Sequence, residues 1–250
     1  MHTISLIVPC YNEELNIQKG VLDKIGNYVR HVPSIKEVII SDDGSTDDSK
    51  GIIKKDYLHE YPIFTLLENE HKGKAHTLMS AIMAAKSEYV IFTDIDLATP
   101  IEEIEKMVVE IEKGTDIIIG SRSPTRKGAP FARKVMAVGF IIVRNFMIGL
   151  KKIKDTQCGF KAFNTEKAKK IIQALVVFKK THTVSGSSVS AGFDLEFLFL
   201  ATKFGYSITE IPVMWTHVET KNVNFLTDSI ETLKDIFEIK YYDLIGSYKK

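Results

Sequence analysis

The sequence contains little cysteine, no excess of either charge and no long apolar run. Its two cysteines, Cys10 and Cys158, have neither the spacing of a metal site nor the number of a disulfide framework, so we expect a reducing compartment. Lysine and arginine number 33 against 32 aspartates and glutamates, which gives a net charge of +1 at pH 7. Nucleic-acid-binding proteins usually carry a strong basic field, so no nucleic-acid partner is expected.

Membrane-spanning and secretory segments are not expected either. The longest apolar segment, Val135 to Leu150, has 16 residues and contains Arg144, whereas a spanning helix needs about 20 mostly apolar residues. The N-terminus enters a strand pattern at Ile4 without the basic flank and cleavage site of a signal peptide. We therefore expect a cytoplasmic protein.

Strand and helix patterns alternate in the first half of the sequence, and the composition, 44% hydrophobic over 250 residues, allows one large α/β domain. The predicted strands are Ile4–Val8, Glu37–Ser41, Phe64–Leu67, Tyr89–Thr93 and Asp116–Gly120. The predicted helices between them are Glu14–Val29, Asp47–His59, Lys74–Ala85 and Ile101–Glu112. Helix starts are marked by residues 45–48 and by Thr99-Pro100, with the proline at the first helical position. This succession predicts a mostly parallel sheet flanked by helices.

The second half loses this alternation. It begins with a basic segment, the apolar stretch and the motif Asp155–Lys161. A Ser/Gly-rich segment (183–192), a helix (193–203), a strand (Ile208–Val213) and a terminal helix from Phe225 follow. Because no repeat or low-complexity linker separates the halves, we expect one continuous unit over residues 1–250.

Two carboxylates, Asp94 and Asp96, directly follow the apolar run Tyr89–Phe92. A buried strand would place them at the carboxyl end of the sheet, where open α/β folds bind ligands. Carboxylate oxygens, completed by water and phosphate, suit Mg²⁺ or Mn²⁺. Taken alone, Asp-x-Asp is more often a solvated turn or a helix cap.

Two other polar turns are predicted at the same edge, and their convergence favours a binding site. Pro9, Tyr11 and Glu13 follow the first strand, and Asp42-Asp43 with Gly44 follow the second. An aspartate there can accept a hydrogen bond from a pyrimidine N–H or a ribose hydroxyl, and an aromatic ring can stack on a base.

These motifs, in this order, resemble glycosyltransferase family 2. Further motifs narrow the resemblance to the dolichyl-phosphate glucosyltransferase branch and its polyprenyl-phosphate hexosyltransferase relatives, over residues 4–215. They are Gly73-Lys74, Gly120-Ser121-Arg122, Arg133 and Asp155–Lys161. The resemblance implies a GT-A-type nucleotide-diphospho-sugar transferase fold, with a nucleotide-sugar-binding half at residues 1–121 and an acceptor-binding half at 122–250.

For the donor side, the resemblance implies roles for eight residues. The donor-binding residues are Pro9, Tyr11, Glu13, Asp42, Asp43, Lys74 and Asp94, with Asp42 supporting its turn, and the metal ligands are Asp94 and Asp96. Two positions depart from related sequences. Ala98 replaces a Gln that joins the metal shell in mannosyl enzymes, and Leu97 replaces a Gly common in eukaryotic glucosyl enzymes.

For the acceptor side, the resemblance implies that Arg122 and Arg133 bind the phosphate of a polyprenyl lipid, because arginine offers a planar fork of donors. Asp94, Asp96, Arg122 and Asp155 form the predicted catalytic set. Asp155 orients the sugar or an arginine, or instead caps the turn at residues 156–159. A lipid phosphate needs no strong base to attack the sugar, so we expect inversion to a β-linked product.

Cations flank the apolar stretch, so a helix pair within residues 131–150 is expected either at a lipid headgroup layer or as ordinary core. Residues 183–192 are a lid or a mobile connection. Trp215 with Thr220-Lys221 matches a segment that closes the site in relatives, and His217 is expected to be structural.

The sequence therefore predicts glucose transfer from UDP-glucose to dolichyl or another polyprenyl phosphate, peripherally at the cytoplasmic face of a membrane. Relatives often carry transmembrane helices, so a membrane-protein partner is a further expectation. The alternatives are a GDP-mannose donor, a saccharide acceptor, or a binding module without turnover.

Overall fold

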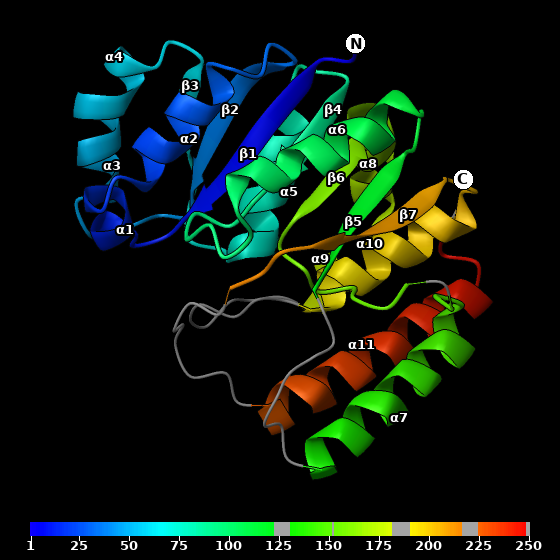
Figure 1. Cartoon of the computed structure of the whole chain (residues 1–250). Helices are drawn as coiled ribbons and strands as arrows, with labels where there is room; N and C mark the ends of the chain where they lie inside the picture. Colours follow the sequence, from blue (N-terminus) through cyan, green and yellow to red (C-terminus); the bar gives the residue numbers. More distant parts are fainter. Residues whose placement is uncertain (123–130, 152, 182–190, 217–224, 249–250) are drawn as a thin grey trace.

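A computed structural model describes residues 1–122, 131–151, 153–181, 191–216 and 225–248. Within these residues a seven-stranded sheet has the order β3-β2-β1-β4-β6-β5-β7 (Figure 1). The strands are β1 (Ile4–Cys10), β2 (Ile35–Asp42), β3 (Phe64–Glu68), β4 (Tyr89–Phe92), β5 (Ile117–Arg122), β6 (Lys161–Asn164) and β7 (Ile208–Val213). All strands are parallel to their neighbours except β6, which is antiparallel to both β4 and β5.

The six predicted strands are confirmed, β7 with the predicted bounds and the others with ends that differ by at most two residues. Strand β6 was not predicted, because it has four residues, begins with a charged side chain and runs directly into a helix. Its position matters because it joins β4 to β5, so one sheet includes strands from both sides of residue 121.

Helices cover both faces of the sheet, as parallel strands buried on both sides require. One face packs against α5 (Lys74–Ala84), α8 (Thr165–Ala174), α9 (Val177–Thr181) and α10 (Ala191–Lys203). The other packs against α2 (Val21–Val29) and α6 (Ile104–Glu112). Alternate residues of β1 divide between the two cores: Ile7 lies in the first, whereas Leu6 and Val8 lie in the second.

Three predicted helices are less regular than their spacing indicated. The expected helix Glu14–Val29 is wrong as one element, because Gly20 has φ +80° and separates α1 (Glu14–Gln18) from α2. The segment after β2 divides into α3 (Ser49–Ile52), the π-helical η1 (Ile53–Tyr57) and α4 (Leu58–Glu60).

The start of the fourth predicted helix also differs. Pro100 is the N-cap of the 3₁₀ turn η2 (Ile101–Glu103), which leads into α6, so the expected position of the proline inside the first turn is wrong.

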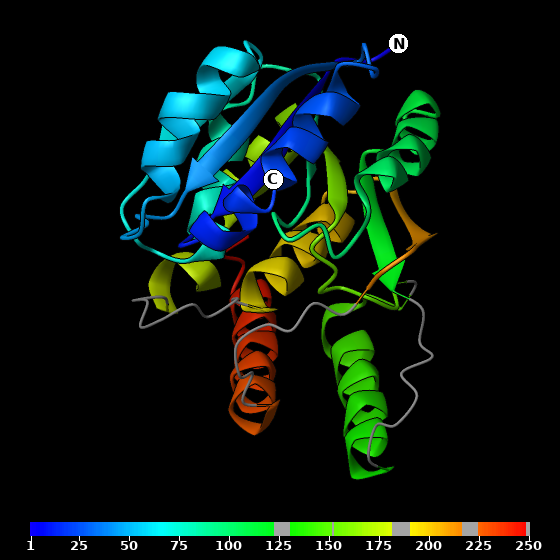
Figure 2. The same ribbon diagram turned by 60° about the vertical axis from the view of Figure 1, so that its left-hand side comes forward.

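Two long helices lie side by side and extend away from the sheet in both ribbon views (Figures 1 and 2). They are α7 (Phe131–Ile148) and α11 (Phe225–Leu244). The expected helix pair within residues 131–150 is therefore wrong: this stretch is one helix, and its partner is the C-terminal helix. In the described parts of the chain, no helix combines the length and apolarity needed to traverse a bilayer.

Candidate active site at the carboxyl edge of the sheet

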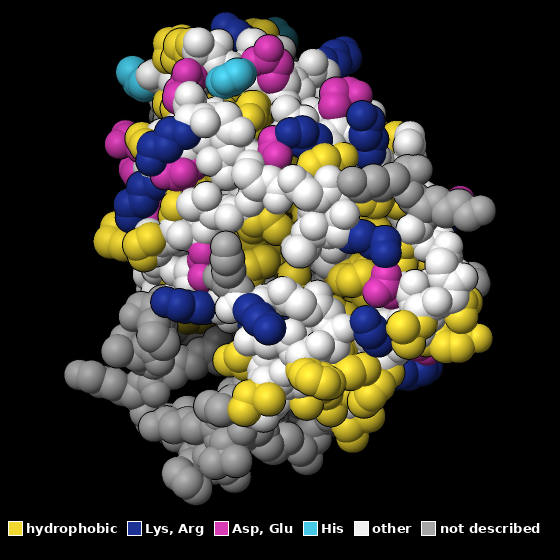
Figure 3. Space-filling model, turned by 90° about the vertical axis from the view of Figure 1, so that its right-hand side faces the viewer, with side chains coloured by type: hydrophobic (Ala, Val, Ile, Leu, Met, Phe, Trp, Pro, Cys, Tyr) yellow, Lys and Arg dark blue, Asp and Glu magenta, His cyan; other side chains and the backbone are white. Residues whose placement is uncertain are grey.

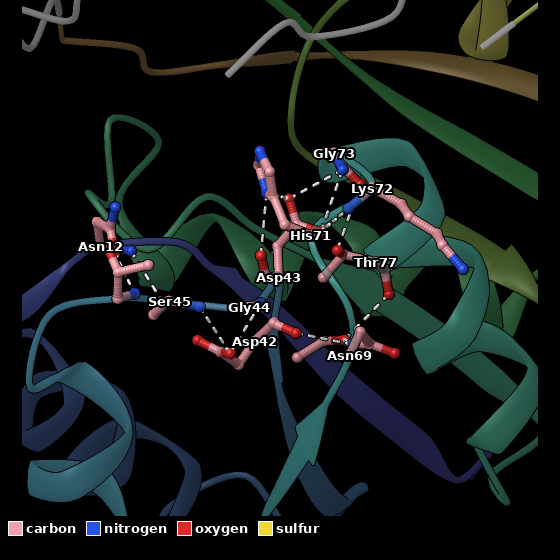
Figure 4. A network of polar contacts seen from close by, with 12 residues as sticks. Asn12, Asp42, Asp43, Gly44, Ser45, Asn69, His71, Lys72, Gly73 and Thr77 are labelled. Atoms are coloured by element: carbon pink, nitrogen blue, oxygen red, sulfur yellow. Dashed lines mark hydrogen bonds and ion pairs between the residues drawn. The ribbon is translucent and has the colours of Figure 1, made fainter. Parts of the chain in front are cut away.

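Polar turns after β1, β2 and β4 meet at one edge of the sheet. β1 is parallel to both β2 and β4, and Cys10 at its end is paired with Asp42 at the end of β2. Their carboxyl ends therefore lie together, as the sequence predicted. Figure 4 shows part of this edge, where the turns after β1 and β2 and the segment before α5 are joined by hydrogen bonds.

The turn after β1 is fixed to the turn after β2 through Asn12. This residue has φ +54°, a left-handed conformation that Asn tolerates because its short side chain bonds locally. Its side-chain oxygen accepts hydrogen bonds from the amides of Thr46 (2.8 Å) and Asp47 (3.3 Å), and its own amide donates to Ser45 Oγ (2.9 Å). The residues on either side, Tyr11 and Glu13, are thereby held in place.

Pro9 is buried within β1, and Glu13 is the N-cap residue of α1. The Glu13 amide donates to Ser49 Oγ (2.9 Å), and its carboxylate accepts from Asn16. The two residues therefore flank the turn after β1.

Asp42 shapes the turn from below. Its side chain is fully buried, and Oδ2 accepts hydrogen bonds from the amides of Gly44 (2.9 Å) and Ser45 (3.0 Å). This is the supporting role that the sequence predicted. Direct contact between Asp42 and a ligand would require the turn to open.

Asp43 organises the segment that leads into α5. Oδ1 accepts from the amides of Lys72 (3.0 Å) and Gly73 (3.1 Å), and Oδ2 accepts from Gly73 (3.0 Å) and from Nδ1 of His71 (3.0 Å). The same imidazole stacks on Tyr11, with ring centroids 4.3 Å apart and planes 12° apart. Both residues predicted to meet the base are therefore engaged by His71.

His71 was not among the predicted site residues. The only available signal was its place between the third strand and the Gly73-Lys74 motif, and a lone histidine in a polar segment is not diagnostic.

Asp94 and Asp96 lie on the turn after β4. Asp94 is paired with Lys74 at the start of α5, and Asp96 Oδ1 accepts from the amide of Ala98 (3.0 Å). Leu97 closes the turn with φ +49°, which explains why glycine suits this position. Gly159 packs so closely that a Cβ there would lie 2.2 Å from Asp94 Oδ2.

The charges of this turn influence one another. Burial raises the pKa of Asp96, and neighbouring Asp94 adds to the rise. Burial alone would lower the pKa of Lys74, but its contact with Asp94 outweighs burial and raises it, with contributions from Asp194 and Asp96.

The carboxylate oxygens of Asp94 and Asp96 fit a divalent cation in part. Two neighbouring carboxylates, one of them disfavoured in its ionised form by burial, would be stabilised by a cation between them. Among the described residues no group of three His, Cys, Asp or Glu side chains gathers as a metal site. Asp94 and Asp96 would therefore supply two oxygen ligands to a bound cation, and the other positions would be left to water and phosphate, as Mg²⁺ and Mn²⁺ accept.

Arg122 and Asp155 form a bidentate pair beside this turn. Arg122 Nε lies 2.7 Å from Asp155 Oδ2 and Nη2 lies 2.9 Å from Oδ1. The hydrogen bond to Asp155 raises the pKa of Arg122; burial would raise the pKa of Asp155, but Arg122 lowers it overall. Asp155 Oδ1 also accepts from the Gln157 amide (3.2 Å), so both predicted alternatives, orienting an arginine and capping the turn, are present.

The segment after β7 covers this pair. The Trp215 ring lies under the guanidinium of Arg122, 5.7 Å from Cζ to the centroid, and the Thr216 amide donates to the carbonyl of Ala98 (2.8 Å). The turn of Asp96 is thus tied to β7.

A second buried ion pair was not predicted. Lys161 is almost fully buried beneath the start of α10, and its Nζ lies 2.6 Å from Asp194 Oδ1. The missed strand β6 is what positions Lys161 opposite Phe92.

Several predicted features lie outside the described residues. The backbone of Arg133 lies in α7, but its side chain is not described. Most of the segment 183–192, His217 and the Thr220-Lys221 pair are likewise not described, so their expected roles stay predictions.

Comparison with known proteins gives a family match. The family model described as "Glycosyl transferase family 2" matches residues 5–172. A dolichyl-phosphate beta-glucosyltransferase of Dictyostelium discoideum is 30% identical over 98% of this chain and 76% of the relative. A protein of the same description from Trichomonas vaginalis is 31% identical over 98% of this chain and 75% of the relative.

The fold also matches solved structures. Glucosyl-3-phosphoglycerate synthase from Mycobacterium tuberculosis, solved with Mn²⁺, UDP and glucosyl-3-phosphoglycerate, superposes with a TM-score of 0.65 at 18% identity, over 96% of this chain and 80% of that one. At this identity the likeness shows the GT-A fold alone.

Proposed function

Because the chain belongs to glycosyltransferase family 2, we propose that it transfers glucose from UDP-glucose to dolichyl or another polyprenyl phosphate. One observation carries the proposal: the Asp94/Asp96 turn and the Arg122–Asp155 pair lie at the same sheet edge, so a site for a nucleoside diphosphate adjoins a site for a second phosphate. The names of the relatives support glucose as the sugar and dolichyl phosphate as the acceptor.

On the donor side, Asp94 and Asp96 would hold Mg²⁺ or Mn²⁺. When bound, the cation neutralises the diphosphate and stabilises the charge that develops as it leaves. Lys74 is paired with Asp94, and its ammonium is available to a diphosphate once the carboxylate has another cation beside it.

On the acceptor side, Asp155 fixes the orientation of Arg122. Its two oxygens use Nε and Nη2, and the Nη1 edge makes no hydrogen bond to a described residue. That edge can donate to an anionic phosphate while Asp155 keeps the guanidinium plane in place. A positioned phosphate oxygen attacks C1 of glucose from the side opposite the diphosphate, which inverts the anomeric centre to β.

We further propose that α7 places the enzyme on a lipid surface. Ile142 and Phe146, one helical turn apart, are 62% and 85% exposed. No acidic residue occurs in α7, and Lys151 and Lys154, both exposed, follow its end. Apolar side chains next to cations suit a headgroup layer that contains anionic lipid.

Figure 3 shows hydrophobic side chains gathered on the lower part of one face, with lysine or arginine side chains above them. Two buried free thiols, Cys10 and Cys158, fit a reducing compartment, so the cytoplasmic face of a membrane is the proposed location. A membrane-protein partner remains part of the proposal.

The decisive experiment is transfer of labelled sugar into organic-extractable lipid. Purified protein is incubated with dolichyl phosphate, Mg²⁺ or Mn²⁺, and either UDP-glucose or GDP-mannose. Label from UDP-glucose alone supports the proposal, and label from GDP-mannose alone transfers it to a mannosyl donor. Metal-dependent nucleotide binding without labelled lipid from either donor would overturn the lipid acceptor.

Arg133→Ala should weaken binding of the lipid acceptor more than binding of the donor. Equal loss of both affinities would contradict the role assigned to Arg133.

A further inference from the structure

His71 makes the two contacts that the donor's base is expected to make. Its planar ring lies parallel to Tyr11 at a centroid distance of 4.3 Å. Its Nδ1 lies 3.0 Å from Asp43 Oδ2 and 3.1 Å from the Asp43 carbonyl oxygen. Figure 4 shows the ring rising from the segment before α5, with Nδ1 directed to Asp43.

The chemistry of the contact fixes the position of the ring proton. Nδ1 faces two oxygens that only accept hydrogen bonds, so Nδ1 must carry a hydrogen. The imidazole therefore presents a flat face to Tyr11 and a ring N–H to Asp43. Uracil, with one ring and an N3–H, offers the same pair of features.

We propose that His71 fills the base position of the donor site and is displaced when the nucleotide binds. The inference rests on the proposed function, because it takes the donor to be a uridine nucleotide. His71 thereby sets donor affinity: the base must first replace the imidazole on both Tyr11 and Asp43.

The surrounding contacts allow the ring to leave without loosening the site. The amides of Lys72 and Gly73 hold Asp43 independently of the imidazole. A Cβ at Gly44 would lie 2.8 Å from the His71 amide nitrogen, so the backbone is closely packed there. The side chain is 31% exposed, so a rotamer change can carry the ring into solvent.

The test is UDP binding by calorimetry in the presence of Mn²⁺, without turnover. His71→Ala removes the competing ring, and we expect UDP to bind about three- to tenfold more tightly. The reason is that only the fraction of protein with the ring displaced can bind UDP, and this fraction sets the apparent affinity. His71→Phe should give a smaller gain, because its ring still stacks on Tyr11 but offers no N–H to Asp43. His59→Ala, an exposed histidine on α4, is the matched control and should leave the affinity unchanged.

A second ligand separates the two contacts. CDP offers no ring N–H to Asp43, so it should gain much less than UDP from His71→Ala, and an equal gain would overturn the role of Asp43. Weaker UDP binding by His71→Ala would show that the ring contacts the nucleotide, and unchanged binding would show that the ring does not compete with the base. Either result would overturn the proposal. The same holds if neither protein binds UDP. Because no acceptor is present, failure of lipid transfer is a separate result and leaves this test valid.

Discussion

At the edge formed by β1, β2 and β4, the carboxylates of Asp42 and Asp43 are buried and bonded to backbone amides, whereas α7 and α11 expose large apolar side chains such as Phe146 and Phe237. The first region is closed by internal hydrogen bonds, whereas the second leaves these apolar side chains uncovered by the described residues. A phosphate-binding edge needs fixed donors and acceptors, because reorganising them would cost part of the binding energy. A lipid-facing helix needs only area and charge.

The comparison separates two kinds of substitution. Changes at the sheet edge should lower the rate of transfer from the bound donor, whether the acceptor is soluble or in a membrane. Changes to the exposed apolar side chains of α7 should affect only an acceptor that is presented in lipid. The Arg122–Asp155 pair lies between the two regions and should affect any phosphate acceptor.

The largest effect is expected from Asp96→Asn. Loss of one of the two carboxylates that would hold the cation removes several kcal/mol of charge stabilisation, so kcat should fall about a thousandfold. The melting temperature should be unchanged or higher, because burial already disfavours the ionised form. Steady-state kinetics and calorimetry check this, with exposed Asp56→Asn as control. A near-normal rate would exclude the metal role.

Asp155→Asn should produce the next largest effect. Arg122 then loses its bidentate partner, and KM for the lipid phosphate should rise about tenfold while KM for the donor stays constant. Arg122→Lys, which keeps the charge but not the fork, should show the same pattern. Steady-state kinetics with each substrate varied in turn measures the two KM values. If the KM values for the lipid phosphate and for the donor rose together, the pair would not act on the acceptor alone.

Phe146→Glu should reduce binding to vesicles that contain anionic lipid by about tenfold, since burying a large apolar side chain contributes about 1.5–3 kcal/mol. Transfer to a short, detergent-soluble polyprenyl phosphate should not change. Leu15→Glu on α1, where the leucine is 72% exposed, is the matched control. Equal losses in both variants in a vesicle flotation assay would rule out α7 as the contact surface.

A pH effect is expected where α11 packs against α10. Burial raises the pKa of Asp235 to about 6, with Glu238 and Glu231 adding to the rise. A carboxyl whose pKa is raised by folding stabilises the native state while it is protonated, so its contribution is present below about pH 4 and lost as pH rises through about 6.

Asp235→Asn should therefore increase the free energy of unfolding at pH 7 by about 1–2 kcal/mol. It should also remove part of the decrease in this free energy between pH 5 and pH 7. Urea unfolding at the two pH values measures both quantities. A variant that is less stable at pH 7 would show that the charged form has a favourable partner.

The smallest effect concerns Leu97. Its left-handed backbone costs about 1 kcal/mol, but its half-buried side chain also packs against the core, so Leu97→Gly should change stability by less than about 1 kcal/mol. Leu97→Ala loses the packing without relieving the backbone. It should therefore unfold at a lower urea concentration than Leu97→Gly. If Leu97→Gly unfolded first, the left-handed backbone of Leu97 would not be strained.

The sequence predicted the parallel part of the sheet because short apolar runs such as Ile4–Val8 alternate there with helical patterns. It did not reveal β6, since four residues beginning with a buried lysine resemble a loop. Spacing also cannot reveal the left-handed break at Gly20, because glycine adopts either sign of φ in any pattern. Nor can it identify the helix that pairs with α7, because that contact is distant in sequence.

The identities and order of the polar motifs, by themselves, determined which residues meet at this edge of the sheet: a parallel β-α succession allows Tyr11, Asp43 and Asp94 no other common location. Tertiary structure alone decided how each side chain is used. Asp43 is engaged by the His71 segment, Arg122 is oriented by an aspartate 33 residues away, and Lys161 is buried against Asp194. Hydrogen bonds and ion pairs need distances of about 3 Å, and only the packed chain brings such distant residues that close.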